Sequence, residues 1–440
     1  MRDRSAFRNP WLFIPSLYFG EGLPYILVNT VSVIIYKKMG ADNATIAFWT
    51  SWLYLPWVIK MFWGPLVDTN TTKRNWILAT QAAMACCMLV TAWSLTITQF
   101  FFLSLAAFVI GAFISATYDI AADGYYMLAL TEKEQAFFVG LRSGFYRLAM
   151  IFGSGLLVYL AGRIEAAFGS IPLSWSVVMS IAGAIFALAF AYHYFILPYP
   201  PSDDRRAPGD HAGRTSFKEV FTAYFKQEKV GVLVAFILLY RLGEAMLLKL
   251  VPPFLLDPHV AGGLGLTTSE VGLVYGTVGI LALVTGGILG GALIAKFGLR
   301  RCIWPLVLAM HLPDLFFVYM AYAQPPVAFA YPLVALEQFG YGMGFTVFTV
   351  TLMYSAEGNY KTSHYAISTG IMALGMMLPG FLAGWLQQAV GYRMFFIVVC
   401  FLTIPGMLTI PFLPGKKADA VPKVGASKRR GDKGTRGKKI

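Results

Sequence analysis

The chain has 440 residues, of which 57% are hydrophobic and only 13% are charged. Because soluble domains carry about 25% charged residues, this composition excludes an ordinary soluble protein and indicates a polytopic membrane protein. The formal net charge of +13 would indicate a nucleic-acid partner only if the basic residues formed a patch that could bind the phosphate backbone. The four cysteines have neither disulfide nor metal spacing, so we expect buried thiols and no metal or cofactor.

Twelve apolar runs are long enough to cross the hydrocarbon of a bilayer, which takes roughly 20 residues each. They lack the alternation of barrel strands, so the sequence predicts an all-α polytopic membrane protein. The first run is too long for a signal peptide and has no cleavage site, and we interpret it as an uncleaved span. The predicted spans are about 11–36, 44–67, 75–98, 100–130, 136–161, 171–198, 231–256, 267–295, 302–323, 327–354, 363–389 and 391–413.

The longest polar interruption divides these spans six and six. We therefore predict an N-terminal six-helix bundle (1–198), a cytoplasmic linker (199–230), a C-terminal six-helix bundle (231–413) and a basic tail (414–440). The tail is rich in Lys, Arg and Gly, a composition typical of disorder.

The distribution of Lys and Arg predicts the orientation. With the N-terminus in the cytoplasm, 26 of the 35 basic residues lie in inner segments and 4 in outer loops. Cytoplasmic loops are the basic ones in membrane proteins, so both termini are expected in the cytoplasm. This bias explains the net charge without nucleic acid. The basic tail either contacts anionic lipid or is basic only because cytoplasmic segments generally are. We favour the second interpretation.

Two inner loops repeat one pattern: GPLVDTNTTKR at 64–74 and GALIAKFGLRR at 291–301. Each resembles the loop signature of the major facilitator superfamily, although Thr71 and Ala295 replace its second glycine and its aspartate, one in each copy. Their equivalent positions indicate parallel repeats. The candidate gating residues are Gly64, Asp68, Lys73, Arg74, Gly291, Gly298, Arg300 and Arg301, together with Arg142.

Charged side chains inside spans are costly and commonly functional. Seven of eleven fall on spans one, four, seven and ten, which line the central cavity in the superfamily that the loops resemble. The eleven are Glu21, Lys60, Asp119, Asp123, Arg142, Arg147, Arg241, Glu244, Lys249, Asp314 and Glu337.

Asp119 and Asp123 are four residues apart, so they share one helix face. Two like charges in a poorly solvated place cannot both ionise cheaply, which suits a reversible proton carrier. Span four runs inward, so Asp119 is expected in its inner half, as a proton or substrate residue. Asp123 lies nearer the boundary, and a gate or interfacial residue paired with Arg142 or Lys133 is the alternative.

The arginines of span five, Arg142 and Arg147, either neutralise these aspartates or bind an anionic substrate. On span seven, Arg241 and Glu244 are three residues apart, a spacing that permits a local ion pair.

Glu21 lies between two glycines ahead of Pro24, where backbone can face a cavity; a kink without function is the alternative. Lys60 is expected to extend its amine to the inner interface. We assign no site role to three residues of outer-type helices, His193, His311 and Asp314. The tryptophans of span two either stack on sugar rings or, as is more common, anchor the interface: Trp49, Trp52, Trp57 and Trp63.

Motifs spread over nearly the whole chain resemble the AmpG-type permeases, the bacterial muropeptide transporters of the major facilitator superfamily. In this sequence they read GLP at 22–24, KMFWGPLVD at 60–68, WILATQ at 76–81, DIAAD at 119–123, YRLAM at 146–150, LYRLGEA at 239–245, LE at 336–337 and GMG at 342–344.

The resemblance implies a proton-driven importer of the bacterial cytoplasmic (inner) membrane, with a muropeptide as cargo. Tyr118, Tyr126 and Leu128 depart from the family pattern, which puts the cargo in question. Related branches carry siderophores or acetyl-CoA.

We therefore expect a monomeric secondary transporter that couples protons to a small anionic substrate within the lipid bilayer. Transport of another cargo, or export, is the alternative. A membrane enzyme or a sensor is disfavoured, because no metal motif, phosphate loop or soluble signalling domain is present. The expected proton and substrate residues are Glu21, Asp119, Asp123, Arg147, Arg241, Glu244, Lys249, Glu337 and Gln338.

Overall fold

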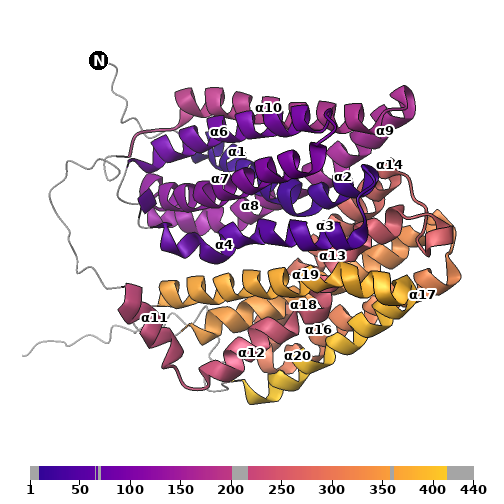
Figure 1. Ribbon diagram of the computed structural model, residues 1–440. Coiled ribbons are helices and arrows are strands. Elements are labelled where there is room, and N and C mark those ends of the chain that lie inside the picture. The colour runs from indigo at the N-terminus through magenta and orange to yellow at the C-terminus, as the bar shows by residue number, and fades with distance from the viewer. Residues whose placement is uncertain (1–8, 65, 68–70, 201–216, 357–360, 414–440) are drawn as a thin grey trace, which may run out of the picture.

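The computed structural model describes residues 9–64, 66–67, 71–200, 217–356 and 361–413, and every regular element among them is helical. Two bundles of long, roughly aligned helices lie side by side, the N-terminal one above the C-terminal one in Figure 1. The predicted all-α polytopic fold is confirmed, and described helices cover each of the twelve predicted spans.

The N-terminal bundle contains long helices that are interrupted in spans one, two and five. Span one has a π-helical turn (Leu27–Val31) that begins three residues after Pro24, and span five has another (Ile151–Leu157). The main helices are α1 (Ile14–Ile26), α2 (Ser32–Lys38), α3 (Asn43–Ser51), α4 (Leu55–Ile59), α6 (Lys73–Ser94), α7 (Phe100–Ala129), α8 (Glu132–Met150), α9 (Val158–Phe168) and α10 (Ile171–Ile196).

The C-terminal bundle follows the short helix α11 (Phe217–Phe225), which lies within the predicted linker. Gly391 has φ +72° inside α19, so the chain turns there from span eleven into span twelve. The helices are α12 (Val230–Tyr240), α13 (Leu242–Leu256), α14 (Thr268–Val271), α15 (Ile280–Phe297), α16 (Leu299–His311), α17 (Leu315–Ala323), α18 (Val327–Ser355), α19 (Lys361–Leu402) and α20 (Ile404–Thr409), with a π-helical segment at Gly272–Gly279.

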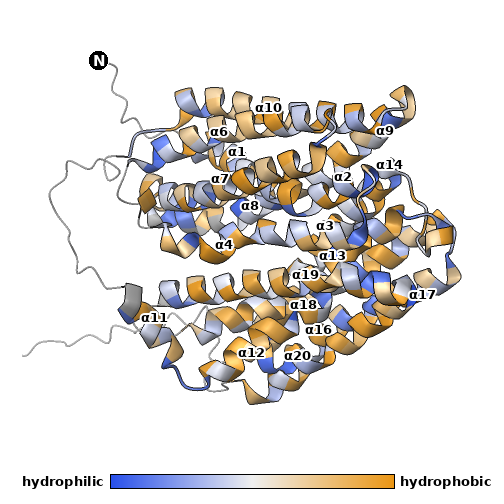
Figure 2. Ribbon diagram, in the orientation of Figure 1, coloured by the Kyte–Doolittle hydropathy of each residue, from blue (hydrophilic) through white to orange (hydrophobic). Residues whose placement is uncertain are grey.

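Large apolar side chains cover the outer faces of both bundles. Phe102, Leu188 and Ile288 are 66%, 70% and 68% exposed to the surroundings of the chain. In Figure 2 hydrophobic residues run along the helices, whereas hydrophilic ones gather towards the helix ends. In the described part of the chain, nine helices are long and apolar enough to cross a membrane. This is the surface expected of a multi-pass membrane protein.

Hydrogen bonds and the Lys37–Asp257 ion pair join the two bundles at one end, here called the sealed end. Figure 1 shows α2, α3 and α14 near one another at this end. Lys37 pairs with Asp257 at 2.6 Å, and the Asn43 amide donates to Gln387 and to the Tyr392 hydroxyl, each at 2.8 Å. Asp257 also accepts from Tyr392 at 2.7 Å, so these residues form one connected network.

Small residues allow the bundles to approach closely there. The π-helical segment of span eight packs on that of span five, and a Cβ added at Gly276 would overlap the carbonyl oxygen of Ser154. On the other side of the interface, a Cβ at Gly384 of α19 would overlap the Asn43 carbonyl oxygen of α3. Backbone therefore meets backbone between the bundles, with no side chain in between.

We predict that Gly276→Ala lowers the thermal unfolding midpoint of the detergent-solubilised protein, because overpacking a close contact costs about 1–3 kcal/mol. Tryptophan fluorescence during heating measures the midpoint. Gly140→Ala on α8 is the control, since a Cβ there meets nothing within 4 Å. Equal midpoints for the two variants would contradict the tight packing described here.

Candidate functional site

A cavity lies between the two bundles and holds about 840 Å³ of atom-free space, including the part open to solvent. Spans one, seven and ten contribute to its wall as the superfamily resemblance implied, whereas no described residue of span four does. The polar lining consists of Tyr25, Asn29, Thr30, Tyr54, Ser154, Arg241, Lys249, Tyr275, Gln338 and Tyr341.

Asp119 is buried on α7 and is held by span two. The Trp57 indole donates to its Oδ2 at 3.0 Å, and the Lys60 ammonium lies 3.4 Å from the same oxygen. The expectation that Lys60 extends to the inner interface is therefore wrong. The amine bonds a buried carboxylate instead, since an unpaired carboxylate at that depth would cost more than the loss of water around the amine. Trp57 likewise bonds Asp119 in addition to packing.

Asp123 makes a separate pair one helical turn further along α7. The Arg142 guanidinium donates to Asp123 Oδ1 at 2.8 Å and to the Tyr18 hydroxyl at 2.9 Å, and that hydroxyl also lies 3.2 Å from Asp123 Oδ1. The predicted alternative of pairing with Arg142 is confirmed. The two aspartates share a helix face but have different partners, so they are not one carboxylate pair.

Glu21 is half-buried on α1, and its Oε2 is enclosed without a hydrogen-bond partner among the described residues. A Cβ at Gly22 would clash with the backbone oxygen of Tyr146, so α1 lies directly against α8. Arg147 of α8 is half-buried and is absent from the cavity lining. Of the three described carboxylates predicted from the sequence to lie within spans of this bundle, only Glu21 has an enclosed oxygen without a hydrogen-bond partner.

Arg241 enters the cavity from the break between α12 and α13. Its guanidinium donates to the Tyr341 hydroxyl at 2.5 Å and lies 5.1 Å from the centre of the Phe345 ring. The predicted local ion pair with Glu244 does not form, since both Glu244 oxygens are enclosed without a partner. Helical spacing fails here because Arg241 has φ −104° and ψ 10°, which interrupts the helix between the two residues.

Lys249 is the second basic residue of the cavity wall. Its ammonium donates to the Thr50 hydroxyl of α3 at 3.0 Å and lies 5.3 Å from the centre of the Tyr54 ring. The contact crosses between the bundles. Neither Lys249 nor Arg241 forms an ion pair with another described residue, so both positive charges are available to an anion in the cavity.

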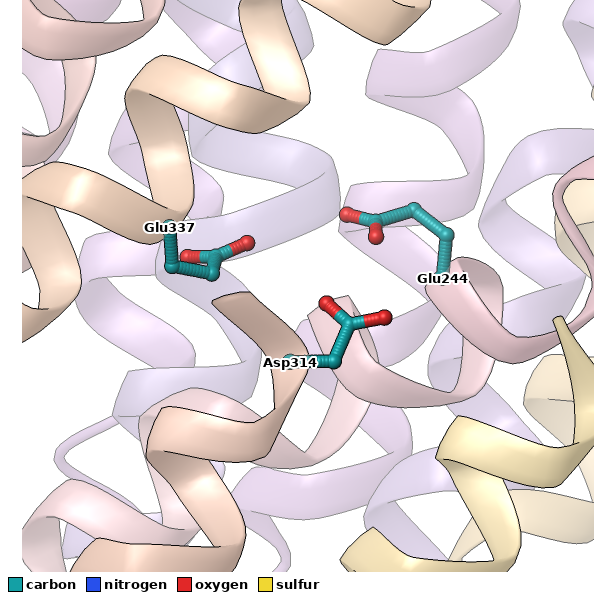
Figure 3. A group of neighbouring side chains, drawn as sticks. All are labelled: Glu244, Asp314 and Glu337. Carbon is teal, nitrogen blue, oxygen red and sulfur yellow. The ribbon is translucent and has the colours of Figure 1, made fainter. Parts of the chain in front are cut away.

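Glu337 and Glu244 lie behind this wall rather than in it. The Gln338 amide, which lines the cavity, donates to Glu337 Oε2 at 2.9 Å. The structure places Asp314 beside both glutamates, with carboxylate oxygens of the three within 4.8 Å of one another (Figure 3). Sequence reasoning assigned no role to Asp314. A charged residue inside an apolar run was the available signal for a functional role of Asp314. We discounted it because span nine is an outer-type helix of the superfamily.

Those candidate gating residues that the structure describes lie at the end of the bundles opposite the sealed end. Arg74 donates to the carbonyl oxygens of Tyr194 and Leu197 and stacks 4.0 Å from the centre of the Tyr199 ring. The aliphatic part of Lys73 packs on Gly124 of α7. Gly298 has φ +81° where α15 turns into α16. Asp68 lies outside the described residues.

The positions that depart from the family pattern lie inside the N-terminal bundle. The Tyr118 hydroxyl donates to the Leu17 carbonyl oxygen at 2.9 Å, and the Tyr126 hydroxyl donates to that of Gln135. His193, which we assigned no site role, joins Ser16 (2.8 Å) to Gln81 (2.7 Å) in the same bundle. These side chains hold helices together and do not line the cavity.

A model of the Major Facilitator Superfamily matches residues 16–378. The chain belongs to the major facilitator superfamily. It is therefore a multi-pass membrane transporter of a small molecule and not an enzyme. The nucleoside transporter NupG has the same fold, with a TM-score of 0.70 at 15% identity, covering 92% of this chain and 100% of that one.

The resemblance to AmpG-type permeases is confirmed. The anhydromuropeptide permease of Escherichia coli (strain K12) is 25% identical over 399 residues, which cover 90% of this chain and 77% of that protein. The putative transporter AmpG 4 of Rickettsia conorii (strain ATCC VR-613 / Malish 7) is 23% identical over 432 residues, covering 94% of this chain and 99% of that protein.

We predict an energetic coupling between Lys60 and Asp119. Lys60→Met and Asp119→Asn should each lower the thermal unfolding midpoint in detergent. The decrease in the double variant should be smaller than the sum of the decreases in the two single variants. The Lys60 side chain is 36% exposed, so the coupling energy should be small, about 1 kcal/mol or less. Strict additivity in the double-mutant cycle would contradict a direct interaction.

Proposed function

We propose that this transporter imports a muropeptide or a related anionic amino-sugar fragment together with protons, across the bacterial cytoplasmic membrane. The observation that carries the proposal is that two cations of the cavity lining, Arg241 and Lys249, have no ion-pair partner among the described residues and lie beside tyrosine rings of the same lining. Cations can hold a carboxylate of the cargo, and aromatic rings can cover the apolar faces of sugar rings. The relatives named for anhydromuropeptide transport support this class of cargo.

The N-terminal bundle is proposed to carry the proton. Asp119 is buried and Glu21 has one enclosed carboxylate oxygen. Among the described residues, Lys60 is the one cation that forms an ion pair with Asp119, at 3.4 Å. A proton on Asp119 would release Lys60, and its loss would restore the pair. Asp123 is proposed to be a gate residue, because Arg142 already neutralises it at 2.8 Å.

The two bundles are proposed to rock about the cavity, so that access alternates between the two sides of the membrane. The basic segments predict that the linker and both termini lie in the cytoplasm, so the sealed end is proposed to face outward. Opening that end requires breaking the Lys37–Asp257 pair and the Asn43 hydrogen bonds. The Lys249–Thr50 contact also crosses between the bundles, so cargo that binds Lys249 would compete with it.

Import coupled to protons predicts accumulation of a radiolabelled anhydromuropeptide in proteoliposomes with an acidic exterior, and no accumulation without a pH gradient. Asp119→Asn should abolish gradient-driven accumulation while leaving exchange of labelled for unlabelled cargo. Glu228→Gln is the control, since it neutralises an exposed carboxylate that does not line the cavity. Accumulation by Asp119→Asn equal to wild type would contradict the proton assignment.

Lys249→Met should raise KM for the anionic cargo by about tenfold or more, since a hydrogen bond to a charged group is worth about 1.5–3 kcal/mol. Arg163→Gln, an exposed position at the sealed end, serves as the control and should leave KM unchanged. Amidation of the cargo's carboxylates should raise KM to a similar extent in wild type, and it should raise KM little further in Lys249→Met. A siderophore or acetyl-CoA that outcompetes the muropeptide would instead support the alternative cargo classes.

A further inference from the structure

Three carboxylates from three different helical elements converge inside the C-terminal bundle. Glu244 comes from α13, Asp314 from the 3-10 turn Leu312–Asp314 that separates α16 from α17, and Glu337 from α18. Figure 3 shows their carboxylate groups pointing towards a common centre. One oxygen of each lies within 4.8 Å of the others.

The local sequence explains why they meet. Gly340, one turn after Glu337, places α18 against α16, since a Cβ there would overlap the Ala309 carbonyl oxygen. Pro313 lies in the 3-10 turn, which changes the direction of span nine immediately before α17 and positions Asp314. The helix break at Arg241 sets the start of α13, and Glu244 lies in its first turn.

The carboxylates have few partners. Glu244 exposes none of its surface, and Asp314 and Glu337 expose 1% each. Both oxygens of Glu244, both of Asp314 and Oε1 of Glu337 have no hydrogen-bond partner among the described residues. The His311 ring nitrogen Nδ1 is 3.7 Å from Asp314, too far for a hydrogen bond, and neither ring nitrogen has a partner.

Such an arrangement is unfavourable without added positive charge. Ionised carboxylates this close repel one another, and burial removes the water that would solvate them. Arg241, the cation nearest in sequence, directs its guanidinium to Tyr341. Enclosed oxygens without donors are what an oxygen-coordinated ion requires, and this is the observation that separates the cluster from a chance group of acids.

We propose that Glu244, Asp314 and Glu337 form a binding site for a hard metal cation of the size of Na⁺ or Ca²⁺. Oxygen-only ligands favour hard cations over zinc or copper. Calcium bonds oxygen at about 2.3–2.6 Å, so one central ion can reach oxygens as far apart as these. Magnesium usually keeps several waters, for which this buried cluster is a poor match.

The bound ion would act on the cavity through its neighbours. Glu244 and Glu337 immediately precede Ala245 and Gln338, both of which line the cavity. An ion between them would fix spans seven, nine and ten relative to one another, and with them the positions of Arg241 and Gln338. The site does not depend on the proposed cargo or on proton coupling.

The test uses the purified full chain in detergent, exchanged into choline chloride with a chelator. NaCl is then titrated at constant ionic strength, and CaCl₂ in a second series, while the thermal unfolding midpoint is recorded. Binding of ²²Na⁺ or ⁴⁵Ca²⁺ is measured in parallel. We expect a saturable rise of the midpoint with one of the two ions, and the ion that gives it identifies the ligand.

Glu244→Gln, Asp314→Asn and Glu337→Gln should each weaken the apparent affinity at least tenfold. Each should also raise the midpoint in cation-free buffer, because one repelling charge is removed. Glu228→Gln, which neutralises an exposed carboxylate outside the cluster, should leave both quantities as in wild type. The proposal is overturned if neither ion shifts the midpoint, if the variants respond as wild type does, or if the midpoint depends on pH alone, which would mean that only protons occupy the cluster. These readouts do not involve uptake, so they are independent of the transport assays.

Discussion

Charged side chains inside an apolar helical bundle must find an opposite charge, a hydrogen-bond donor or a water-filled space, and this requirement governs how the helices of this transporter are placed. Lys60 meets Asp119, and Arg142 meets Asp123, so much of the charge of the N-terminal bundle is neutralised locally. The C-terminal bundle is different. Arg241 and Lys249 face the cavity, while three carboxylates lie behind its wall.

This unequal distribution suggests a division of labour between the bundles. In the proposed function, carboxylates of the N-terminal bundle carry the proton, and the cations beside tyrosine rings in the cavity hold the anionic cargo. Lys249 connects the two roles, because its hydrogen bond to Thr50 crosses the interface. Occupancy of the cavity by an anion would weaken a contact that holds the bundles together near the sealed end.

The same interface must be tight and reversible. Glycines at Gly276 and Gly384 let backbone approach backbone, which excludes solvent without large interdigitating side chains that would resist sliding. The polar network around Asn43 and Asp257 adds specificity at this end. Hydrogen bonds of this kind can exchange for water when the bundles separate, so opening has a modest net cost.

The sequence by itself determined the all-α polytopic fold and the family, because apolar length and spaced motifs are local properties. The direction of the spans is a prediction from the basic loops. The sequence also offered pairing of Asp123 with Arg142 or Lys133 as an alternative, and the structure shows the pair with Arg142. The sequence could not show that Lys60 reaches Asp119, that Arg241 turns away from Glu244, or that Asp314 joins Glu244 and Glu337. Those outcomes depend on a helix break at Arg241 and on glycine contacts between distant spans. Side-chain partners in a bundle are decided by how helices pack, and packing brings together residues that spacing along the chain cannot relate.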